Sequence, residues 1–167
     1  MEFRIATISD INRIMDIIRQ AQEYLRNKGV DQWQDNYPNL NIIRDDIEKR
    51  KGYVLEKDGQ VVATVAISFS DEKTYEKIYE GKWITENEYA VIHRIAVDNN
   101  FKGKRLSSEI IAQVEKMCLQ SDIYSIKVDT HKQNESMKKM LSNNGFQYCG
   151  IIFLEDGSER VAYEKVI

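Results

Sequence analysis

The chain has 167 residues, of which 42% are hydrophobic and 31% are charged, and its formal net charge is −3. This composition is typical of a globular protein, and the length fits one domain that spans residues 1–167. Nucleic-acid-binding proteins usually present a strongly basic face, so the acidic balance argues against that class. The sequence shows no secretory signal and no apolar run long enough to span a membrane, and we therefore expect a cytoplasmic protein without a membrane partner.

The two cysteines give no sign of a metal centre. Cys118 lies on the apolar face of a predicted helix and Cys149 lies in an apolar strand, and neither belongs to a Cys-x-x-Cys pair or to a His/Cys spacing typical of metal ligands. Free cysteine is a common core residue, so we interpret both as reduced packing residues and expect no bound metal.

The chain is predicted to begin with a short strand and two helices. Residues 3–6 form the strand, and Ser9 can cap a helix whose apolar residues recur every three or four positions. Gly29 can end this helix. A loop rich in aromatic and polar residues then leads to a shorter helix at residues 42–51, which Gly52 stops.

A β-hairpin is predicted next. Its strands cover residues 53–57 and 60–70, and they are joined by Asp58-Gly59, a strong signal for a two-residue hairpin turn. Apolar residues alternate along the second strand, which indicates that one of its faces is buried. The polar segment 71–88 can hold a short helix.

The second half of the chain continues to alternate. A strand, helix and strand in succession indicate a right-handed parallel crossover, whereas hairpins indicate antiparallel pairs. We therefore expect a mixed sheet with helices on both faces. The predicted elements are a strand at 89–97, a helix that begins at Leu106, a strand at 124–130, a helix at 134–143 and strands at 146–153 and 159–167.

The turn before the helix at Leu106 suits a phosphate group. The first turn of a helix has N–H groups without internal partners, and its dipole is positive there, so such an end binds anions. Gly103 lets the backbone approach a ligand closely, and Lys102, Lys104 and Arg105 add positive charge. A solvated basic turn is the alternative interpretation. The P-loop and the Gly-x-Gly-x-x-Gly dinucleotide motif are both absent.

The surroundings of this turn resemble a known family. The run 92–97, continued by residues 102–107, resembles the central motif of the GNAT N-acetyltransferase superfamily, in which a hydrophobic strand and a short turn precede Gln/Arg-x-x-Gly-x-Gly/Ala. Asn134 and the pair Gly145-Phe146 resemble signature residues of the strand and helix that follow in the family. The order of elements matches along essentially the whole chain.

The resemblance implies a fold and a cosubstrate. The fold would be an α/β, GNAT-like mixed and mostly antiparallel sheet with a central splayed parallel strand pair and helices on both faces. The cosubstrate would be acetyl-CoA, with its pantetheine arm along the first strand of that pair and its pyrophosphate at the turn. The implied cofactor-binding residues are Ile95, Ala96, Val97, Lys102, Gly103, Lys104, Arg105, Leu106, Ser107, Ser108 and Asn134.

The sequence departs from the family pattern at several positions. Arg105 stands where the family most often has Gly, and Ser107 stands where it has Gly or Ala. We expect Arg105 to have a negative φ at the start of the helix and therefore no backbone strain. Leu141 replaces the tyrosine that often protonates the leaving thiolate in the family, so the usual general acid is missing.

Two residues are candidates for the proton acceptor. Strand alternation would place Val91, His93 and Ile95 on one face, and some members of the family carry a catalytic carboxylate at the position of Val91. His93 is a candidate base because imidazole titrates near neutral pH; a hydrogen-bonded core histidine is the alternative. Glu88, at the mouth of the same strand, could act through water, and a solvated glutamate is its alternative.

Trp33 and Tyr37 are the candidates for binding the acceptor. In the family the loop between the first two helices contributes to the acceptor site, and Trp33 could form an aromatic wall there or merely anchor the loop. We therefore expect an enzyme, an N-acetyltransferase that moves an acetyl group from acetyl-CoA directly to a primary amine of a small molecule or a peptide. A non-catalytic acyl-CoA-binding or regulatory domain is the alternative, and the chain could be a monomer or a homodimer.

Overall fold

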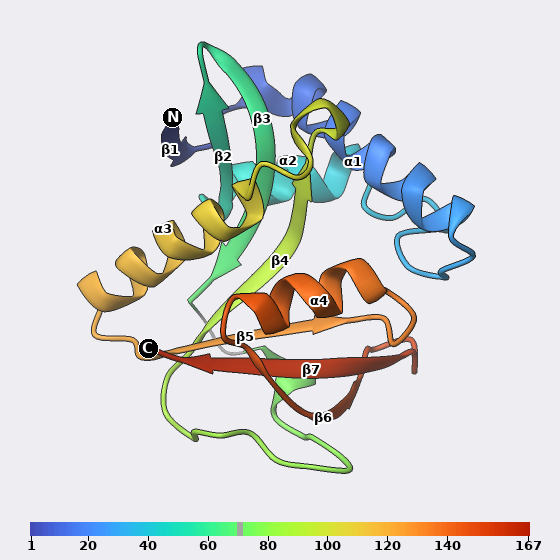
Figure 1. Ribbon diagram of the computed structural model, residues 1–167, viewed down its shortest axis with the longest axis vertical. Helices are drawn as coiled ribbons and strands as arrows, with labels where there is room; N and C mark the ends of the chain where they lie inside the picture. Colours follow the sequence, from blue (N-terminus) through green and yellow to red (C-terminus); the bar gives the residue numbers. More distant parts are fainter. Residues whose placement is uncertain (70–71) are drawn as a thin grey trace. The chain divides into compact units, whose positions relative to one another are not determined.

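The computed structural model describes residues 1–69 and 72–167 (Figure 1). The strands are β1 Glu2–Ile5, β2 Gly52–Lys57, β3 Gln60–Ser68, β4 Ala90–Val97, β5 Ser125–Thr130, β6 Gln147–Phe153 and β7 Glu159–Val166. The α-helices are α1 Ile11–Asn27, α2 Leu40–Glu48, α3 Leu106–Gln120 and α4 Glu135–Asn143. Three 3-10 turns are η1 Ile8–Asp10, η2 Lys73–Tyr75 and η3 Asn99–Phe101.

The strands join in one sheet with the order β1-β2-β3-β4-β5-β7-β6. The pairs β1–β2, β2–β3, β5–β7 and β6–β7 are antiparallel, and β4–β5 is parallel. The parallel ladder joins Ala90 to Ile126 and Val91 to Lys127. This confirms the predicted mixed, mostly antiparallel sheet with a central parallel pair.

The chain divides into two compact units. The first contains Met1–Ile67 and His93–Gln113, and the second contains Ser68–Ile92 and Val114–Ile167. Strand β4 and helix α3 therefore each contribute residues to both units. The expectation of a single domain over residues 1–167 stays a prediction.

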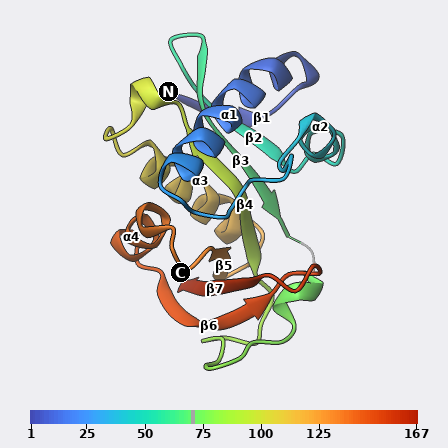
Figure 2. The same ribbon diagram turned by 90° about the vertical axis from the view of Figure 1, so that its right-hand side faces the viewer.

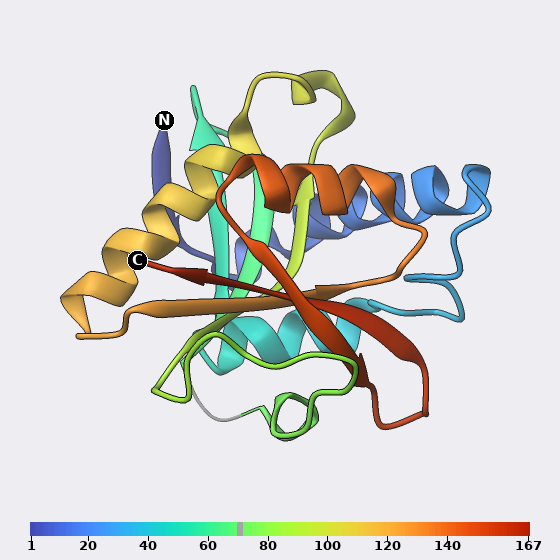
Figure 3. The ribbon, with the colours of Figure 1, turned by 60° about the horizontal axis from the view of Figure 1, so that its bottom comes forward.

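The second unit is built around β5, β7 and β6. Figures 2 and 3 show α4 on one side of these strands and the segment 72–89 on the other. The apolar core on the side of segment 72–89 contains Tyr75, Val91, Ile152 and Ala162, with Ile78, Trp83 and Tyr89 packed against it.

Both cysteines lie in this unit and are buried. Burial raises the pKa of Cys118 to about 11 and also raises the pKa of Cys149, so both thiols stay protonated at neutral pH.

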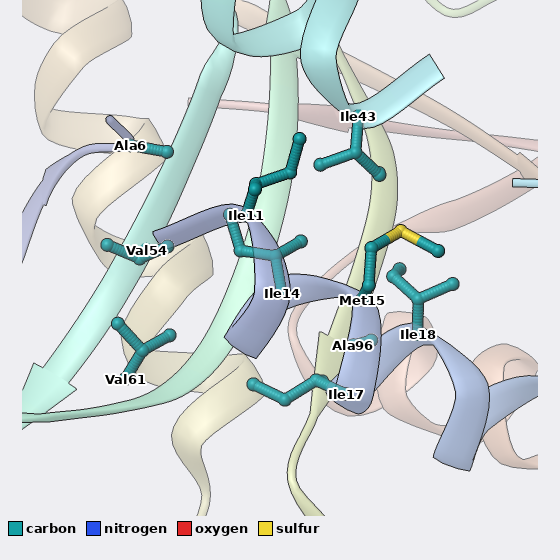
Figure 4. Packing of buried hydrophobic residues seen from close by; sticks show 10 residues of the cluster. All are labelled: Ala6, Ile11, Ile14, Met15, Ile17, Ile18, Ile43, Val54, Val61 and Ala96. Carbon is teal, nitrogen blue, oxygen red and sulfur yellow. The ribbon is translucent and has the colours of Figure 1, made fainter. Parts of the chain in front are cut away.

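The first unit has its core between α1 and the strands. Figure 4 shows apolar side chains of α1 directed at β2, β3 and β4, with α3 on the far side of these strands. The periodic apolar residues of α1 are therefore its buried face, as their spacing predicts. This core contains Ala6, Ile11, Ile14, Met15, Ile17, Ile18, Ile43, Val54, Val61 and Ala96.

Three helix boundaries differ from the predictions. Ser9 does not cap α1, because the turn η1 precedes the helix and Asp10 occupies the N-cap position. Helix α2 begins two residues earlier than predicted, since the side chain of Asn39 accepts a hydrogen bond of 3.1 Å from the Ile42 N–H. Gly52 does not stop α2 either, because the helix ends at Glu48 and Gly52 is the first residue of β2.

The predicted hairpin is confirmed. Asp58 and Gly59 have φ angles of 51° and 77°, which are the positive values that a tight two-residue turn requires. Strand β3 ends at Ser68, and the predicted end of this strand at Ser70 lies outside the described residues, as does Asp71 at the start of the next predicted segment. The short helix predicted in that segment is η2. None of the described helices has the length and apolar character needed to cross a membrane.

Candidate functional site

The turn between β4 and α3 has the backbone that the sequence suggests for an anion site. After η3, Gly103 has a φ of 78°, which glycine adopts without steric cost. Helix α3 begins at Leu106, and its first internal hydrogen bond is donated by Glu109 N–H to Arg105 C=O over 3.1 Å. The amides of Leu106, Ser107 and Ser108 therefore have no acceptor within the helix, and they form its positive end.

Arg105 differs from the prediction. Its φ is 59°, in the left-handed region, whereas a negative φ was expected at the helix start. The helix begins at Leu106 as predicted, and Arg105, the residue before it, belongs to the turn and does not take a helical φ. A side chain in this conformation costs about 1 kcal/mol, because Cβ approaches the following carbonyl oxygen. This strain explains why glycine suits the position.

Two lysines of the turn lie over aromatic rings. The Lys102 Nζ is 4.4 Å from the centroid of the Tyr24 ring, and the Lys104 Nζ is 4.9 Å from that of Phe101. Within residues 1–69 and 72–167, the ion pairs do not include Lys102, Lys104 or Arg105. Their positive charge is therefore not neutralised by a carboxylate, and it remains available to an anion.

Strand β4 is interrupted at Arg94. This residue has a φ of 51°, so the predicted alternation of side chains is not regular between His93 and Ile95, whereas Val91 and His93 both precede the interruption. The Arg94 guanidinium donates hydrogen bonds of 2.7 and 2.6 Å to the carboxylate of Asp46. The argument for His93 as a base uses the step from Val91 to His93, which lies before Arg94, and His93 as the base stays a prediction.

The residues predicted to bind the acceptor lie in the first unit with the turn. Trp33 packs against the apolar core of the first unit, and whether it also forms a wall of the acceptor site stays a prediction. The hydroxyl of Tyr37 accepts a hydrogen bond of 3.0 Å from Arg94 Nη1. Tyr37 is 40% exposed, and its own O–H remains able to donate to a ligand.

Two predicted site residues belong to the second unit. Glu88 is exposed and lies two residues before the start of β4. Asn134 is the N-cap residue of α4, and its side-chain oxygen accepts a hydrogen bond of 3.1 Å from the Met137 N–H. Leu141 is fully buried on α4, so the position of the usual tyrosine holds a packing residue. Among the residues that the structure describes, no group of His, Cys, Asp and Glu is arranged to hold a metal ion.

Similarity to known proteins identifies the family. Residues 12–146 match the acetyltransferase (GNAT) family. The chain belongs to this family. A solved GNAT-family acetyltransferase from Streptococcus agalactiae 2603 is 35% identical, has a TM-score of 0.91 and aligns over 99% of this chain and 95% of that one.

Two further relatives of this GNAT protein are more distant. The S-alkylcysteine N-acetyltransferase of Bacillus subtilis is 24% identical over 120 residues, and the matched region spans 70% of this chain and 60% of that protein. The PaiA N-acetyltransferase from Thermoplasma acidophilum, solved in complex with coenzyme A, has a TM-score of 0.75 at 13% identity and covers 99% of this chain and 98% of that one. At such identity the second relative supports the fold alone.

Membership confirms the predicted class of enzyme. GNAT proteins are N-acetyltransferases that take the acetyl group from acetyl-CoA, so the predicted activity and cosubstrate are confirmed at the level of the family. The residues that hold the cofactor, the residues that move protons and the identity of the acceptor remain predictions for this chain.

Sequence reasoning missed a polar cluster in the second unit of this GNAT protein. The hydroxyl of Tyr75, a buried residue, donates a hydrogen bond of 2.5 Å to Asp129 on β5. Burial and the charge of Asp129 hold the pKa of Tyr75 well above its usual range, so the phenol keeps its proton. Lys127, two residues earlier, places its Nζ 4.3 and 4.0 Å from the ring centroids of Trp83 and Tyr89. The only signal in the sequence was the presence of two charged residues, Lys127 and Asp129, within a predicted strand.

Proposed function

We propose that this GNAT protein transfers an acetyl group from acetyl-CoA to the primary amine of a small molecule or a peptide, and that the turn 102–108 holds the cofactor's pyrophosphate. The observation that carries this proposal is the start of α3, where helix amides without internal partners coincide with lysines whose charge is not neutralised. The PaiA relative, which has coenzyme A bound, supports a coenzyme A site in this fold.

Different parts of the backbone around the turn would bind different parts of acetyl-CoA. Amides of Leu106, Ser107 and Ser108 would donate to pyrophosphate oxygens. The edge of β4 from Ile95 to Val97 would pair with the amide groups of the pantetheine arm, as an added strand does. Ala96 is buried in the core, so only its backbone can take part. When bound, acetyl-CoA supplies the activated acetyl thioester.

Groups of this chain would then stabilise the negative charge that develops on the thioester oxygen and accept the proton of the amine. The acceptor nitrogen must be neutral to attack the thioester carbon, and as the C–S bond breaks the thiolate leaves. A strand N–H at or near Ile95 would stabilise the negative oxygen of the intermediate. His93 or Glu88 would receive the proton of the amine. Leu141 cannot protonate the thiolate, which is a tolerable leaving group at neutral pH, so the missing acid lowers the rate by at most ~10²–10⁴-fold.

The acceptor is proposed at the level of chemical class. Tyr37 and Trp33 are the candidate contacts, and Tyr37 presents a hydroxyl held by Arg94. Because one relative is an S-alkylcysteine N-acetyltransferase, amino acids with an uncharged side chain are the first acceptors to test. The alternative, a non-catalytic acyl-CoA-binding domain, is favoured by Leu141 and by Arg105.

One assay separates these two functions. The protein is incubated with acetyl-CoA and a panel of amines that contains S-methylcysteine, other amino acids, aliphatic amines and short peptides, and free thiol is followed over time. We expect thiol release above that of the same acetyl-CoA and amine mixture without protein for at least one member. Measurable binding of coenzyme A without release for any amine would support the non-catalytic domain.

A further inference from the structure

A buried carboxylate lies directly before the turn that we assign to the pyrophosphate. Asp98 follows the last residue of β4 and is only 1% exposed. Its Oδ2 accepts hydrogen bonds of 2.8 Å from Arg13 Nη2 and 2.9 Å from Gln20 Nε2, and its Oδ1 accepts one of 2.9 Å from the Asn100 N–H. Every donor is on α1 or on η3, so this carboxylate joins the turn to the helix.

Helix α1 makes further contacts with the same turn. The Oε1 of Gln20 accepts a hydrogen bond of 2.7 Å from the Asn99 N–H, so the amide of Gln20 bonds the turn with both of its ends. One helical turn later, the ring of Tyr24 lies under the ammonium of Lys102. Figure 1 draws η3 beside α1, in agreement with these contacts. We refer to Arg13, Gln20, Tyr24 and Asp98 as the α1 anchor.

Two residues of the α1 anchor also bond to strand β3. Arg13 Nε donates a hydrogen bond of 3.0 Å to the Val61 carbonyl of β3, and the Asp98 N–H donates one of 2.9 Å to the Val62 carbonyl. Burial alone would raise the pKa of Asp98, but the hydrogen bonds from Gln20, the Asn100 amide and Arg13 outweigh it and lower that pKa. The carboxylate is therefore ionised and fully engaged at neutral pH.

We propose that the α1 anchor positions the turn 99–108 for coenzyme A, so that Gln20 and Tyr24 determine cofactor affinity although they would not touch the reacting atoms. This inference rests on the proposed function, because it takes the turn as the pyrophosphate site. A turn whose backbone is already held loses less conformational entropy when a ligand binds. Lys102 reinforces the effect, since its ammonium stays near the turn instead of extending into solvent.

Coenzyme A itself is a sufficient probe. Gln20→Met keeps the length of the side chain and removes both hydrogen bonds, and Tyr24→Leu removes the ring beneath Lys102. Tyr24→Phe keeps that ring and serves as the conservative rescue. Arg19→Ala is the matched control, because Arg19 is the neighbour of Gln20 on α1 and pairs with exposed Asp16 at 3.1 Å. Coenzyme A is titrated calorimetrically into each protein, and unfolding midpoints are recorded in parallel.

We expect Gln20→Met to weaken coenzyme A binding about tenfold, which is ~1.4 kcal/mol, and Tyr24→Leu to weaken it about threefold. Arg19→Ala should bind as the wild type does, and Tyr24→Phe should bind more tightly than Tyr24→Leu because it keeps the ring. With an amine that supports thiol release, Gln20→Met should raise the KM for acetyl-CoA and keep kcat, which a general loss of folded protein would not do.

The outcomes separate this inference from the function on which it rests. If Gln20→Met and Tyr24→Leu bind coenzyme A as tightly as the wild type, the anchor has no positioning role and the inference is wrong while the proposed function stands. If the wild type itself does not bind coenzyme A, the pyrophosphate site is wrong and the inference is overturned with it.

Discussion

Two buried carboxylates, one in each unit, are satisfied in opposite ways. Asp98, in the first unit, has an arginine, a glutamine and a backbone amide as donors. Glu164, in the second unit, is 0% exposed, and all of its donors are neutral: the amides of Ile84 and Thr85 and the hydroxyls of Thr85 and Ser125. Asp98 holds a turn that we assign to the cofactor, whereas Glu164 ties segment 84–85 to β5 and β7.

The two sites differ in whether the groups that donate hydrogen bonds to the carboxylate could instead accept them. A hydroxyl can accept as well as donate, so a neutral amide at position 164 could satisfy the same partners. Around Asp98 the guanidinium of Arg13 and the Asn100 N–H can only donate, and Gln20 is oriented by its bond from Asn99. The first site requires a negative charge, and the second requires only oxygen and nitrogen atoms in the right places.

The largest effect is therefore expected from Asp98→Asn. Either orientation of the new amide places an NH₂ group against a donor. We therefore expect the free energy of unfolding to fall by about 3 kcal/mol, which is near the lower end of the loss that follows when one partner of a buried ion pair is removed. Glu164→Gln is the matched change and should cost less than about 1 kcal/mol. Urea denaturation of both variants measures this, and equal losses would abolish the distinction between the two sites.

Acid should weaken the contribution of Asp98. Its folded-state pKa is lowered, so the carboxylate stabilises the fold at pH values above its ordinary pKa of about 3.9, and this stabilisation is lost as the pH falls through the lowered value. The difference in unfolding free energy between the wild type and Asp98→Asn should therefore be constant near neutrality and shrink on acidification from about pH 5. A difference that does not depend on pH would mean that the charge of Asp98 contributes nothing.

A smaller gain is expected in the turn that Asp98 holds. Arg105→Gly should raise the free energy of unfolding by up to about 1 kcal/mol, because glycine adopts a φ of 59° without the steric cost that arginine bears. Arg50→Gly is the matched control at a φ of 56° outside the proposed site and should give a similar gain. Thermal unfolding measures both. A loss of stability in Arg105→Gly alone would show that the guanidinium of Arg105 stabilises the turn.

The smallest effect concerns Lys127, which faces Glu164 in the β5–β7 register. Burial lowers the pKa of Lys127, and the charge of Glu164 raises it. Removing that charge in Glu164→Gln should lower the pKa of Lys127 further, as an NMR titration of the lysine Cε signal would report. An unchanged pKa would indicate that the rings of Trp83 and Tyr89, rather than Glu164, stabilise the ammonium.

Local signals explain what the sequence could predict. The Asp58-Gly59 turn, the apolar face of α1 and the glycine of the β4–α3 turn each depend on residues close together in the chain, and all three are present in the structure. The order of elements also followed from such patterns, and the family resemblance supplied the cosubstrate. These are the features for which short-range residue patterns carry the information.

Long-range partners explain what the sequence could not predict. Asp98 bonds to Arg13 across 85 residues, and Tyr75 bonds to Asp129 across 54. No spacing rule connects such pairs. The positive φ angles of Arg94 and Arg105 also have no local signal, because arginine rarely adopts that conformation. Asp46 holds the side chain of Arg94, so tertiary contacts determine the interruption of β4.

The most direct test of the pyrophosphate site compares two glycines. Gly103 and Gly59 have φ angles of 78° and 77°, and an added Cβ would meet no atom within 4 Å at either position. Alanine should therefore strain both turns equally, by about 1 kcal/mol. Coenzyme A is titrated calorimetrically into the wild type and into each alanine variant. We predict that Gly103→Ala weakens binding about tenfold and that Gly59→Ala leaves it unchanged. Equal affinities in the two variants would contradict the assignment of the β4–α3 turn to the cofactor's pyrophosphate.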